Sequence, residues 1–464
     1  MFTKIQRIHF VGIGGIGMSG IAEVLLTLGY KVSGSDLKSS AVTQRLAAMG
    51  TQVFEGHRPE NVSFADVVVI SSAILRDNSE VLEAARLHIP VIQRAEMLAE
   101  LMRLKYGIAI GGMHGKTTTT SMVASVLAAG GLDPTVVVGG RVDAMGSNAR
   151  LGKSQYLVAE ADESDRSFLK LSPILSVVTN IDREHMDCYR DMQDVEDTFV
   201  DFMNRVPFYG TVVACADDGP LCALLPRVKR RVVTYGANAA SDFRVQALPT
   251  ASAGEANRVL SRFRVHYKNQ DLGEFHLHVP GQHNVLNSAA AVAVGTVLDI
   301  SADHIREALK SFRGVDRRFQ HKGVVRGITV VDDYGHHPTE IRATLAAARQ
   351  AGFNRVHVIF QPHRYTRTQL LMDDFAAAFS DATTVSILDI YPASENPIPG
   401  ITAEVLSRQI SKNSCLEARY AASFADAVAS AVVLAQPGDL ILTLGAGNVS
   451  QLAPQVVERL SAPQ

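Results

Sequence analysis

Two glycine-rich segments constrain this chain more than any other feature, because each stands between an apolar, strand-like run and a helical pattern. The first reads GIGGIG over residues 12–17. The second reads GGMHGKT over residues 111–117. Glycines let the backbone approach a phosphate closely, and the free N–H groups at the start of the following helix point at it. The sequence therefore predicts two phosphate-binding loops in an α/β protein.

The second loop has the residues of a nucleoside triphosphate site. It alone carries a lysine and a threonine hydroxyl, Lys116 and Thr117. Lysine suits the β- and γ-phosphates, and the hydroxyl suits the accompanying magnesium. The spacing departs from the common pattern, because Gly111 lies four residues before Gly115 rather than five. An ATP or GTP site with Mg²⁺ is still the prediction for this loop.

The first loop is less specific, because a glycine pattern alone is a weak signal. Asp36 follows the next strand-like run, where an acid could bind a ribose hydroxyl. NAD or NADP is one reading, and a glycine turn without a ligand is another. No nicotinamide chemistry is evident downstream, so we expect this loop to hold a different nucleotide.

Length and composition exclude several classes of protein. A chain of 464 residues is expected to form about three domains. The formal net charge is −2, which leaves no electrostatic footprint for nucleic acid or an anionic membrane. We find no apolar run of the roughly 20 residues that a membrane span needs. The four cysteines have neither zinc-site nor disulfide spacing, so a cytoplasmic protein is expected.

Strand-like and helical patterns alternate along most of the chain, which predicts parallel, doubly wound sheets. We expect a Rossmann-like N-terminal domain over residues 1–105, a central domain resembling P-loop ATPases over 106–314, and a Rossmann-like C-terminal domain over 315–464. Residues 240–280 differ, because alternating strand patterns dominate there. They suggest an antiparallel flap on the central domain.

Acidic and histidine residues follow two strand-like runs of the central domain. Glu160 begins the segment EADESD after one run, and His185 lies in the segment TNIDREHMD after another. Ligands bind at the carboxyl ends of strands in such sheets, so both segments are candidates for holding magnesium. A solvated acidic loop and a histidine that caps a helix are the structural alternatives.

Taken together, these motifs resemble the Mur ligases, and the resemblance covers essentially the whole chain. Among these enzymes it is nearest to the one that adds the first amino acid, L-alanine, to UDP-N-acetylmuramate in peptidoglycan biosynthesis. Met113 departs from the threonine that is more usual in the family. No lysine occurs between Lys170 and Lys229, where ligases of later steps carry a carbamylated lysine. The motifs that carry the resemblance are residues 11–20, 112–119, 160–165, 180–187, 281–287, 332–338 and 361–367.

The resemblance implies a role for individual residues. For the UDP-sugar it implies Gly14, Gly15, Gly17, Met18, Ser35, Asp36 and Ser72. For ATP it implies Gly112, His114, Gly115, Lys116, Thr117, Thr118, Asn284, Asn287, Arg317 and Asp333, with Asp332 beside them. For the amino acid it implies Tyr334, His363, Arg364 and Arg367. For the metal it implies Thr117, Glu160 and His185.

The implied reaction is an ATP-dependent amide ligation through an acyl phosphate. Lys116 would stabilise the transferring phosphoryl group, and His336, His337 and His363 are candidates for taking the proton of the amine. Packing or helix capping remains an alternative for these histidines. A recycling ligase that joins a preformed peptide to UDP-N-acetylmuramate is the second hypothesis, and an NADP-binding module with a regulatory ATPase is the third. The expected partners are the two small substrates alone, with the chain a monomer or weak dimer.

Overall fold

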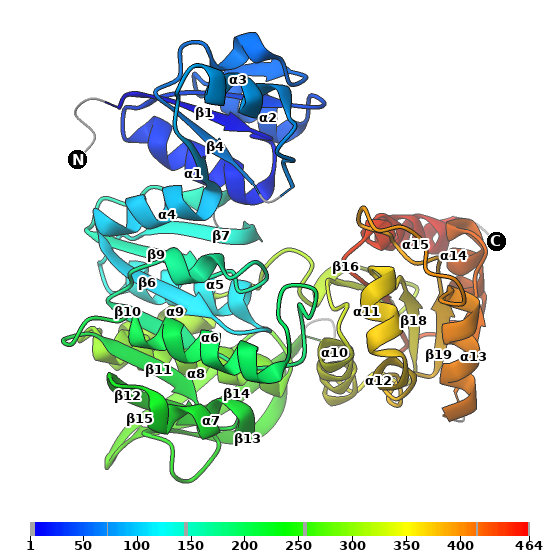
Figure 1. The fold of residues 1–464 in the computed structure, drawn as a ribbon. Helices are drawn as coiled ribbons and strands as arrows, with labels where there is room; N and C mark the ends of the chain where they lie inside the picture. The colour runs from blue at the N-terminus through cyan, green and yellow to red at the C-terminus, as the bar shows by residue number, and fades with distance from the viewer. Residues whose placement is uncertain (1–4, 72, 143–146, 254–257, 414–415, 463–464) are drawn as a thin grey trace. The chain divides into compact units, whose positions relative to one another are not determined.

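The computed structural model describes residues 5–71, 73–142, 147–253, 258–413 and 416–462. Within these ranges the strands form three sheets, each mainly parallel and each alternating with helices along the chain (Figure 1). The contacts between residues define two compact units. One comprises Met1–Ala247, Phe263–Phe275 and Leu286–Ser311, and the other comprises Leu248–Arg262, His276–Val285 and Phe312–Gln464.

The first sheet has the strand order β3-β2-β1-β4-β5, and all its strand pairs are parallel. This order reverses direction at β1, and ligands bind at such a switch point in open α/β sheets. The glycine loop of residues 12–15 leaves β1 at this place. The elements are β1 (Arg7–Val11), α1 (Ile16–Thr27), β2 (Lys31–Asp36), α2 (Ala41–Ala48), β3 (Gln52–Glu55), η1 (Pro59–Val62), β4 (Val67–Ile70), α3 (Ser79–Arg86), β5 (Val91–Gln93) and α4 (Arg94–Arg103).

The second sheet places three strands side by side beneath the lysine loop. β6 (Tyr106–Gly111) lies between β9 (Tyr156–Glu160) and β10 (Leu175–Val178), and both pairs are parallel. Because parallel strands end at one edge of a sheet, the segments after these three strands leave the same edge. The lysine loop continues from β6 into α5 (Lys116–Ala129).

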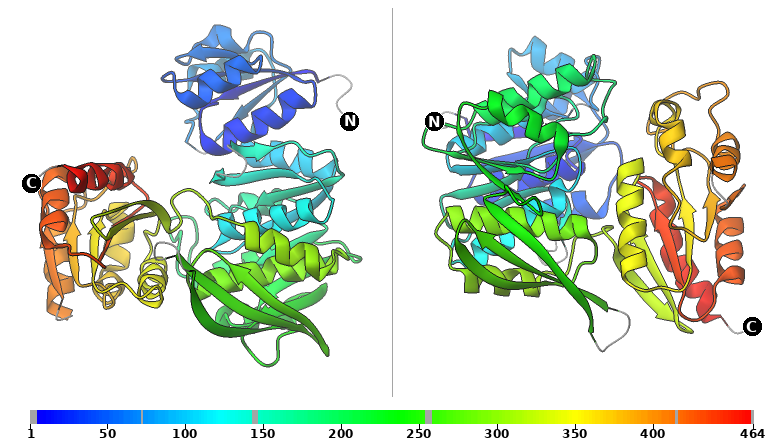
Figure 2. Two further views of the ribbon diagram at one scale, coloured as in Figure 1. Left: turned by 180° about the vertical axis from the view of Figure 1, so that it is seen from behind. Right: turned by 90° about the horizontal axis from the view of Figure 1, so that it is seen from below.

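The second sheet extends further than its sequence pattern indicated. Beyond β10 come β11 (Thr211–Cys215) and β12 (Arg231–Gly236), followed by β13 (Phe243–Ala253), β14 (Arg258–Tyr267) and β15 (Gln270–Leu277). β13 pairs in parallel with β12. The segment expected to form an antiparallel flap on the central domain extends the main sheet of that domain at one edge (Figure 2). At the opposite edge, β8 (Ser147–Arg150) is antiparallel to β7 (Thr135–Val142).

The third sheet is packed on both faces. Its order is β16-β17-β21-β18-β19-β20, with β16 antiparallel and the other pairs parallel. Successive strand residues point to opposite faces, so Val330 joins one apolar cluster and Val331 the other. The strands are β16 (Gln320–Val325), β17 (Ile328–Asp333), β18 (Val356–Phe360), β19 (Thr384–Ile387), β20 (Glu417–Tyr420) and β21 (Leu440–Leu444).

Helices cover the second and third sheets, and within the described ranges none combines the length and apolar character needed to cross a bilayer. They are α6 (Met192–Asn204), α7 (Gly219–Leu224), α8 (Gln282–Val297), α9 (Ala302–Ser311), α10 (Pro338–Gln350), α11 (Tyr365–Leu370), α12 (Met372–Ala376), α13 (Ala403–Asn413), α14 (Phe424–Leu434) and α15 (Leu452–Ser461).

Candidate active site

The two glycines of the lysine loop are required by close packing. Gly112 has φ +126°, and a Cβ atom there would lie 2.0 Å from the Thr179 hydroxyl oxygen. Gly115 has φ +82°, and a Cβ atom there would lie 2.6 Å from Oδ1 of Asn287. Both conformations fall in the left-handed region that glycine adopts without strain. The loop is therefore pressed against the segment after β10 and against α8.

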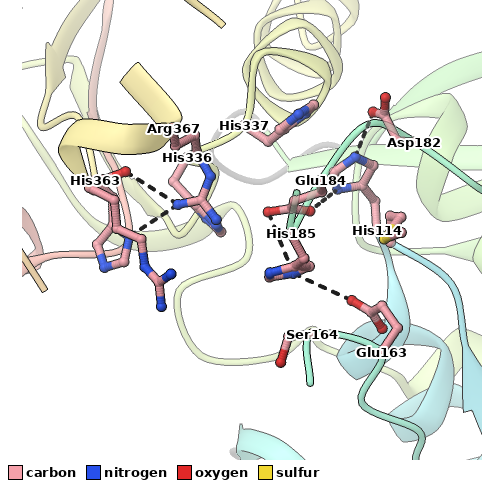
Figure 3. Close-up of polar contacts among 12 residues, drawn as sticks. His114, Glu163, Ser164, Asp182, Glu184, His185, His336, His337, His363 and Arg367 are labelled. Atoms are coloured by element: carbon pink, nitrogen blue, oxygen red, sulfur yellow. Dashed lines mark hydrogen bonds and ion pairs between the residues drawn. The ribbon is translucent and has the colours of Figure 1, made fainter. Parts of the chain in front are cut away.

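Residues after β10 also fix the middle of the loop. The backbone N–H of His114 donates to Asn180 Oδ1 at 2.8 Å, and Asn180 Nδ2 donates back to the His114 carbonyl at 3.0 Å. The Thr179 hydroxyl donates to the same carbonyl at 2.6 Å. The His114 ring lies 2.8 Å from Asp182 Oδ2 through Nε2 (Figure 3). The N–H, the carbonyl and the ring of His114 are thus all held by the segment 179–182.

Lys116 uses all three donors of its ammonium group. Nζ donates to the carbonyls of Gly112 at 2.8 Å and Met113 at 3.0 Å, and to Glu163 Oε1 at 2.7 Å. Burial alone would lower the pKa of Lys116, but the adjacent Glu163 outweighs burial and raises it. The lysine is therefore charged at neutral pH and points into the loop.

Glu163 is the residue of this site that sequence analysis did not single out. Its side chain is 1% exposed, and its Oε1 lies 3.6 Å from His185 Nε2 (Figure 3). The same oxygen is paired with Lys116. Burial raises the pKa of Glu163 to about 7, although the Lys116 charge opposes the shift. Its Oε2 is buried and accepts no hydrogen bond from the part of the chain that the structure describes. The acidic run 160–165 pointed to this segment from sequence, but the run does not show which of its acidic side chains is buried.

The residues expected to bind a metal come from three elements. Thr117 lies in the first turn of α5, Glu160 is the last residue of β9, and His185 follows β10 with φ +55°. Glu160 is paired in register with Ile110 of β6, directly before the loop. Thr118, expected near ATP, is buried in α5.

The first glycine loop is held by the end of β2. The N–H groups of Gly12 and Ile13 donate to the Ser35 carbonyl at 2.8 and 2.9 Å, and Gly14 N donates to Asp36 Oδ2 at 2.8 Å. The Ser35 hydroxyl points into the core rather than outward, as described below. Met18 is buried in α1. Ser72, expected near the UDP-sugar, lies outside the described residues.

Arg94 was not expected from sequence, yet it lies against this loop. A Cβ atom on Gly17 would be 3.0 Å from a terminal guanidinium nitrogen of Arg94. Arg94 also donates to Asp162 Oδ2 at 3.2 Å, and Asp162 precedes Glu163. A cavity of about 310 Å³ is lined by Arg94 together with Gln93, Ala95, Asp165, Arg166, Ser167 and Lys170. Arg94 therefore connects the first turn of α1 with the acidic segment after β9.

In the second compact unit, the expected ATP and amino-acid residues cluster around the ends of β17 and β18. Arg317 donates through Nε to Asp332 Oδ2 at 3.2 Å. Asp333 accepts the N–H groups of Phe319 and Gly335 at 2.7 and 2.8 Å, so its carboxylate is used to shape this turn. The guanidinium groups of Arg317 and Arg318 lie 5.0 and 5.1 Å from the Tyr334 ring centre. In the same unit, Asn284 donates to the Pro280 carbonyl at 2.7 Å.

Hydrogen bonds distinguish the three candidate histidines. His336 Nδ1 lies 3.1 Å from the Tyr334 carbonyl and 3.2 Å from Glu340 Oε2, and both are acceptors. Nδ1 of His336 therefore carries a proton, and in the neutral ring the lone pair is on Nε2. His337 is different, because its Nδ1 accepts the Thr339 N–H at 3.3 Å and caps α10.

His363 also differs from His336. Its Nδ1 lies 3.1 Å from a guanidinium nitrogen of Arg367, which can only donate (Figure 3). The neutral ring of His363 therefore carries its proton on Nε2. The His363 ring stacks on Tyr391 with a centroid distance of 5.5 Å. Arg364, with φ +71°, is the residue directly before α11.

Comparison with known proteins covers nearly the whole chain. Family models match in three consecutive parts: the Mur ligase family, catalytic domain over residues 7–106; the Mur ligase middle domain over 110–295; and the Mur ligase, glutamate ligase domain over 317–447. The UDP-N-acetylmuramate–L-alanine ligases of Koribacter versatilis and Acidobacterium capsulatum are 69% and 66% identical, and each alignment covers 100% of this chain and 99% of the relative.

Solved structures agree in fold. The UDP-N-acetylmuramate–alanine ligase of Thermotoga maritima superposes with a TM-score of 0.81 at 30% identity, over 98% of both chains. A murein peptide ligase from Psychrobacter arcticus shares the fold with a TM-score of 0.68 at 22% identity, over 99% of both chains. The predicted three-domain α/β architecture is confirmed, and the chain belongs to the Mur ligase family.

Proposed function

We propose that this protein is an ATP-dependent ligase that joins L-alanine to the lactyl carboxylate of UDP-N-acetylmuramate, releasing ADP and phosphate. The observation that carries the proposal is the lysine loop, in which Lys116 is charged and paired with Glu163, whose carboxylate also faces His185. Full-length relatives with this activity in their names support the choice of substrates. The expected setting is the cytoplasm, with the chain a monomer or weak dimer.

The proposed reaction has two steps, and residues of the candidate site stabilise charge or bind a substrate in them. A carboxylate oxygen attacks the γ-phosphorus, and the bond from that phosphorus to the β-phosphate oxygen breaks to release ADP. The amine nitrogen then attacks the acyl carbon, the bond from that carbon to the phosphate oxygen breaks, and the nitrogen loses a proton. Lys116 stabilises the charge on the transferring phosphoryl group. His363, Arg364 and Arg367 supply donors for the alanine carboxylate.

The residues around Lys116 fit a divalent cation. The buried Glu163 Oε2 accepts no hydrogen bond from the described chain, so the carboxylate keeps an acceptor that a positive ligand would satisfy. We propose Thr117, Glu160 and His185 as the metal ligands, with Glu163 adjoining them. When bound there, Mg²⁺ would supply positive charge to the phosphate oxygens. A cation at this place would also hold Glu163 in its ionised form.

Among the three histidines, we propose His336 as the base that takes the amine proton. It is the one whose Nδ1 faces two acceptors, so that its Nε2 carries the lone pair. Glu340 stabilises the imidazolium that forms, in the manner of a carboxylate that orients a catalytic histidine. His337 caps a helix, and His363 is oriented by Arg367.

An isotope experiment tests the reaction itself. With oxygen-18 in the lactyl carboxylate of UDP-N-acetylmuramate, one labelled oxygen should appear in inorganic phosphate, and only when an amine acceptor completes turnover. L-Alanine should be the preferred acceptor, with glycine and L-serine poorer by about 10–200-fold, because one methyl or hydroxyl group in a pocket is worth about 1–3 kcal/mol. Labelled AMP would refute the acyl-phosphate route. A preference for a tripeptide over L-alanine would favour the recycling ligase.

Replacing His336 by glutamine tests the base. Loss of a general base should lower kcat by about 10²-fold or more, with little change in ATP binding. The deficit should shrink as pH rises, because the amine of free alanine then loses its proton without help. His304→Gln, on the exposed surface of α9, is the control and should be close to wild type. A deficit of the same size at every pH would argue that His336 orients the alanine instead.

A further inference from the structure

The N-terminal domain buries a carboxylate that the proposed mechanism does not use. Glu80 lies in the first turn of α3, and its side chain is fully buried beneath the first sheet. Burying a carboxylate is costly unless hydrogen bonds replace water. The neighbours of Glu80 therefore show which groups stabilise the buried carboxylate.

Both oxygens of Glu80 have partners from other elements. Oε2 accepts the Ser35 hydroxyl of β2 at 2.6 Å, and Oε1 accepts Asn61 Nδ2 of η1 at 2.5 Å. The imidazole rings of His9 and His57 also face Oε2, at 3.6 and 3.5 Å. Glu80 thus ties β1, β2, the segment after β3 and η1 to the start of α3.

Glu80 acts as an anion in this network. Burial alone would raise its pKa, but the neighbouring His9 and the hydrogen bonds from Ser35 and Asn61 outweigh burial and hold the pKa below its usual range. The carboxylate is therefore ionised at neutral pH. Hydrogen bonds to an ionised acceptor are about twice as strong as neutral ones, so the network is rigid where Glu80 contacts β2.

Ser35 passes this rigidity to the glycine loop. Its hydroxyl donates to Glu80, while its carbonyl accepts the N–H groups of Gly12 and Ile13 at 2.8 and 2.9 Å. The next residue, Asp36, accepts Gly14 N at 2.8 Å. Three consecutive N–H groups of the loop are oriented by two residues of β2, and Glu80 anchors the first of these residues.

We propose that Glu80 is a positioning residue for the UDP-sugar site: through Ser35 it sets the path of the glycine loop that receives the diphosphate. This inference rests on the proposed function of that loop. A buried acid elsewhere in the chain provides the contrast. Asp439 receives Arg355 at 2.7 Å and His357 at 3.3 Å, but it precedes β21 and so lies at the opposite edge of its sheet from the ligand-binding edge.

The test compares Glu80→Gln and Ser35→Ala with the control Asp439→Asn. Glutamine keeps the shape of Glu80 but removes the charge and one of the two acceptor oxygens. For each protein we would measure Kd for UDP and for ATP by calorimetry, the melting temperature, and the KM for UDP-N-acetylmuramate. We expect both test variants to weaken UDP binding and raise this KM by at least about tenfold. Their ATP affinity and their kcat at saturation should stay near wild type.

The control separates positioning from a general effect on stability. Asp439→Asn should lower the melting temperature while leaving UDP affinity unchanged. A folded Glu80→Gln protein with wild-type UDP affinity would overturn the proposal, as would equal losses of UDP and ATP affinity. If Glu80→Gln does not fold, Ser35→Ala decides, because it removes only the hydroxyl group. If the wild-type protein does not bind UDP, the proposed function of the first loop is wrong. If the wild-type protein binds UDP and both variants bind it equally well, only the proposed role of Glu80 is wrong.

Discussion

Replacing Lys116 with methionine is expected to reduce turnover by about 10³-fold while UDP binding stays intact. The ammonium group stabilises charge that develops on the transferring phosphoryl group, and removing one such group from an enzyme typically costs 10²–10³ in kcat. Its apolar stem packs in the loop, so methionine preserves the volume. Steady-state kinetics and UDP calorimetry on the same preparation measure both quantities.

Removing the Lys116 charge also affects its buried partner Glu163, so the variant needs a control for stability. Without the lysine charge, the pKa of Glu163, already raised to about 7 by burial, rises further, so the carboxyl takes up a proton instead of remaining as a bare buried anion. We therefore expect the variant to fold. Lys170→Met is the matched control, because Lys170 pairs with Glu96 at 2.6 Å at a more exposed position. A folded Lys116→Met protein with normal kcat would remove the lysine loop from the reaction.

The second large effect concerns the metal. Glu160→Ala and His185→Ala should each raise the Mg²⁺ concentration needed for half-maximal activity by about 10–100-fold, the range typical of disturbed metal sites. A titration of rate against free Mg²⁺ at saturating ATP measures this requirement. Chelation of the metal from the wild-type protein should abolish turnover reversibly.

Cys188→Ser is the neighbouring control for the metal variants. Cys188 lies close to His185 in sequence, but it is the backbone N–H of Cys188 that donates to the His185 carbonyl, and serine keeps that bond. Its Mg²⁺ requirement should equal that of the wild type. Unchanged requirements in both Glu160→Ala and His185→Ala would place the metal elsewhere.

Two of the strands that sequence predicted well are buried over most of their length. The apolar runs over residues 156–160 and 356–360 predict strands with sharp ends, and the structure gives β9 and β18 these limits. Strands β3, β11, β12, β16 and β20 are among those that were not predicted, although β11 is buried throughout. β20 alternates exposed and half-buried residues at the edge of its sheet, so its sequence lacks the continuous apolar run that marks a strand buried on both faces. The domain boundaries at 105 and 314 remain predictions.

The sequence predicted the candidate site less completely than it predicted the fold. Lys116, Glu160 and His185 were identified because they end or follow strands, and strand ends share an edge; their roles remain predictions. Glu163 was not singled out, since the direction of a side chain in a loop depends on backbone turns that no residue pattern gives. Glu80 and Arg94 were not identified for another reason: their partners are distant in sequence, and only packing brings them together.

The position of β6 between two strands that follow it in the chain has a consequence for synthesis on the ribosome. The loop with Lys116 is synthesised before β9 and β10. A nascent chain that ends before residue 160 therefore contains the loop but not the two complete strands that flank β6. Glu163 and His185 are added only later, and with them the full set of groups around Lys116. Because a ligand stabilises only the state that binds it, ATP cannot assist the folding of the first third of this protein. Until then the N-terminal domain folds without help from ATP, which begins to stabilise the chain only after the segment ending at Asp187 has emerged.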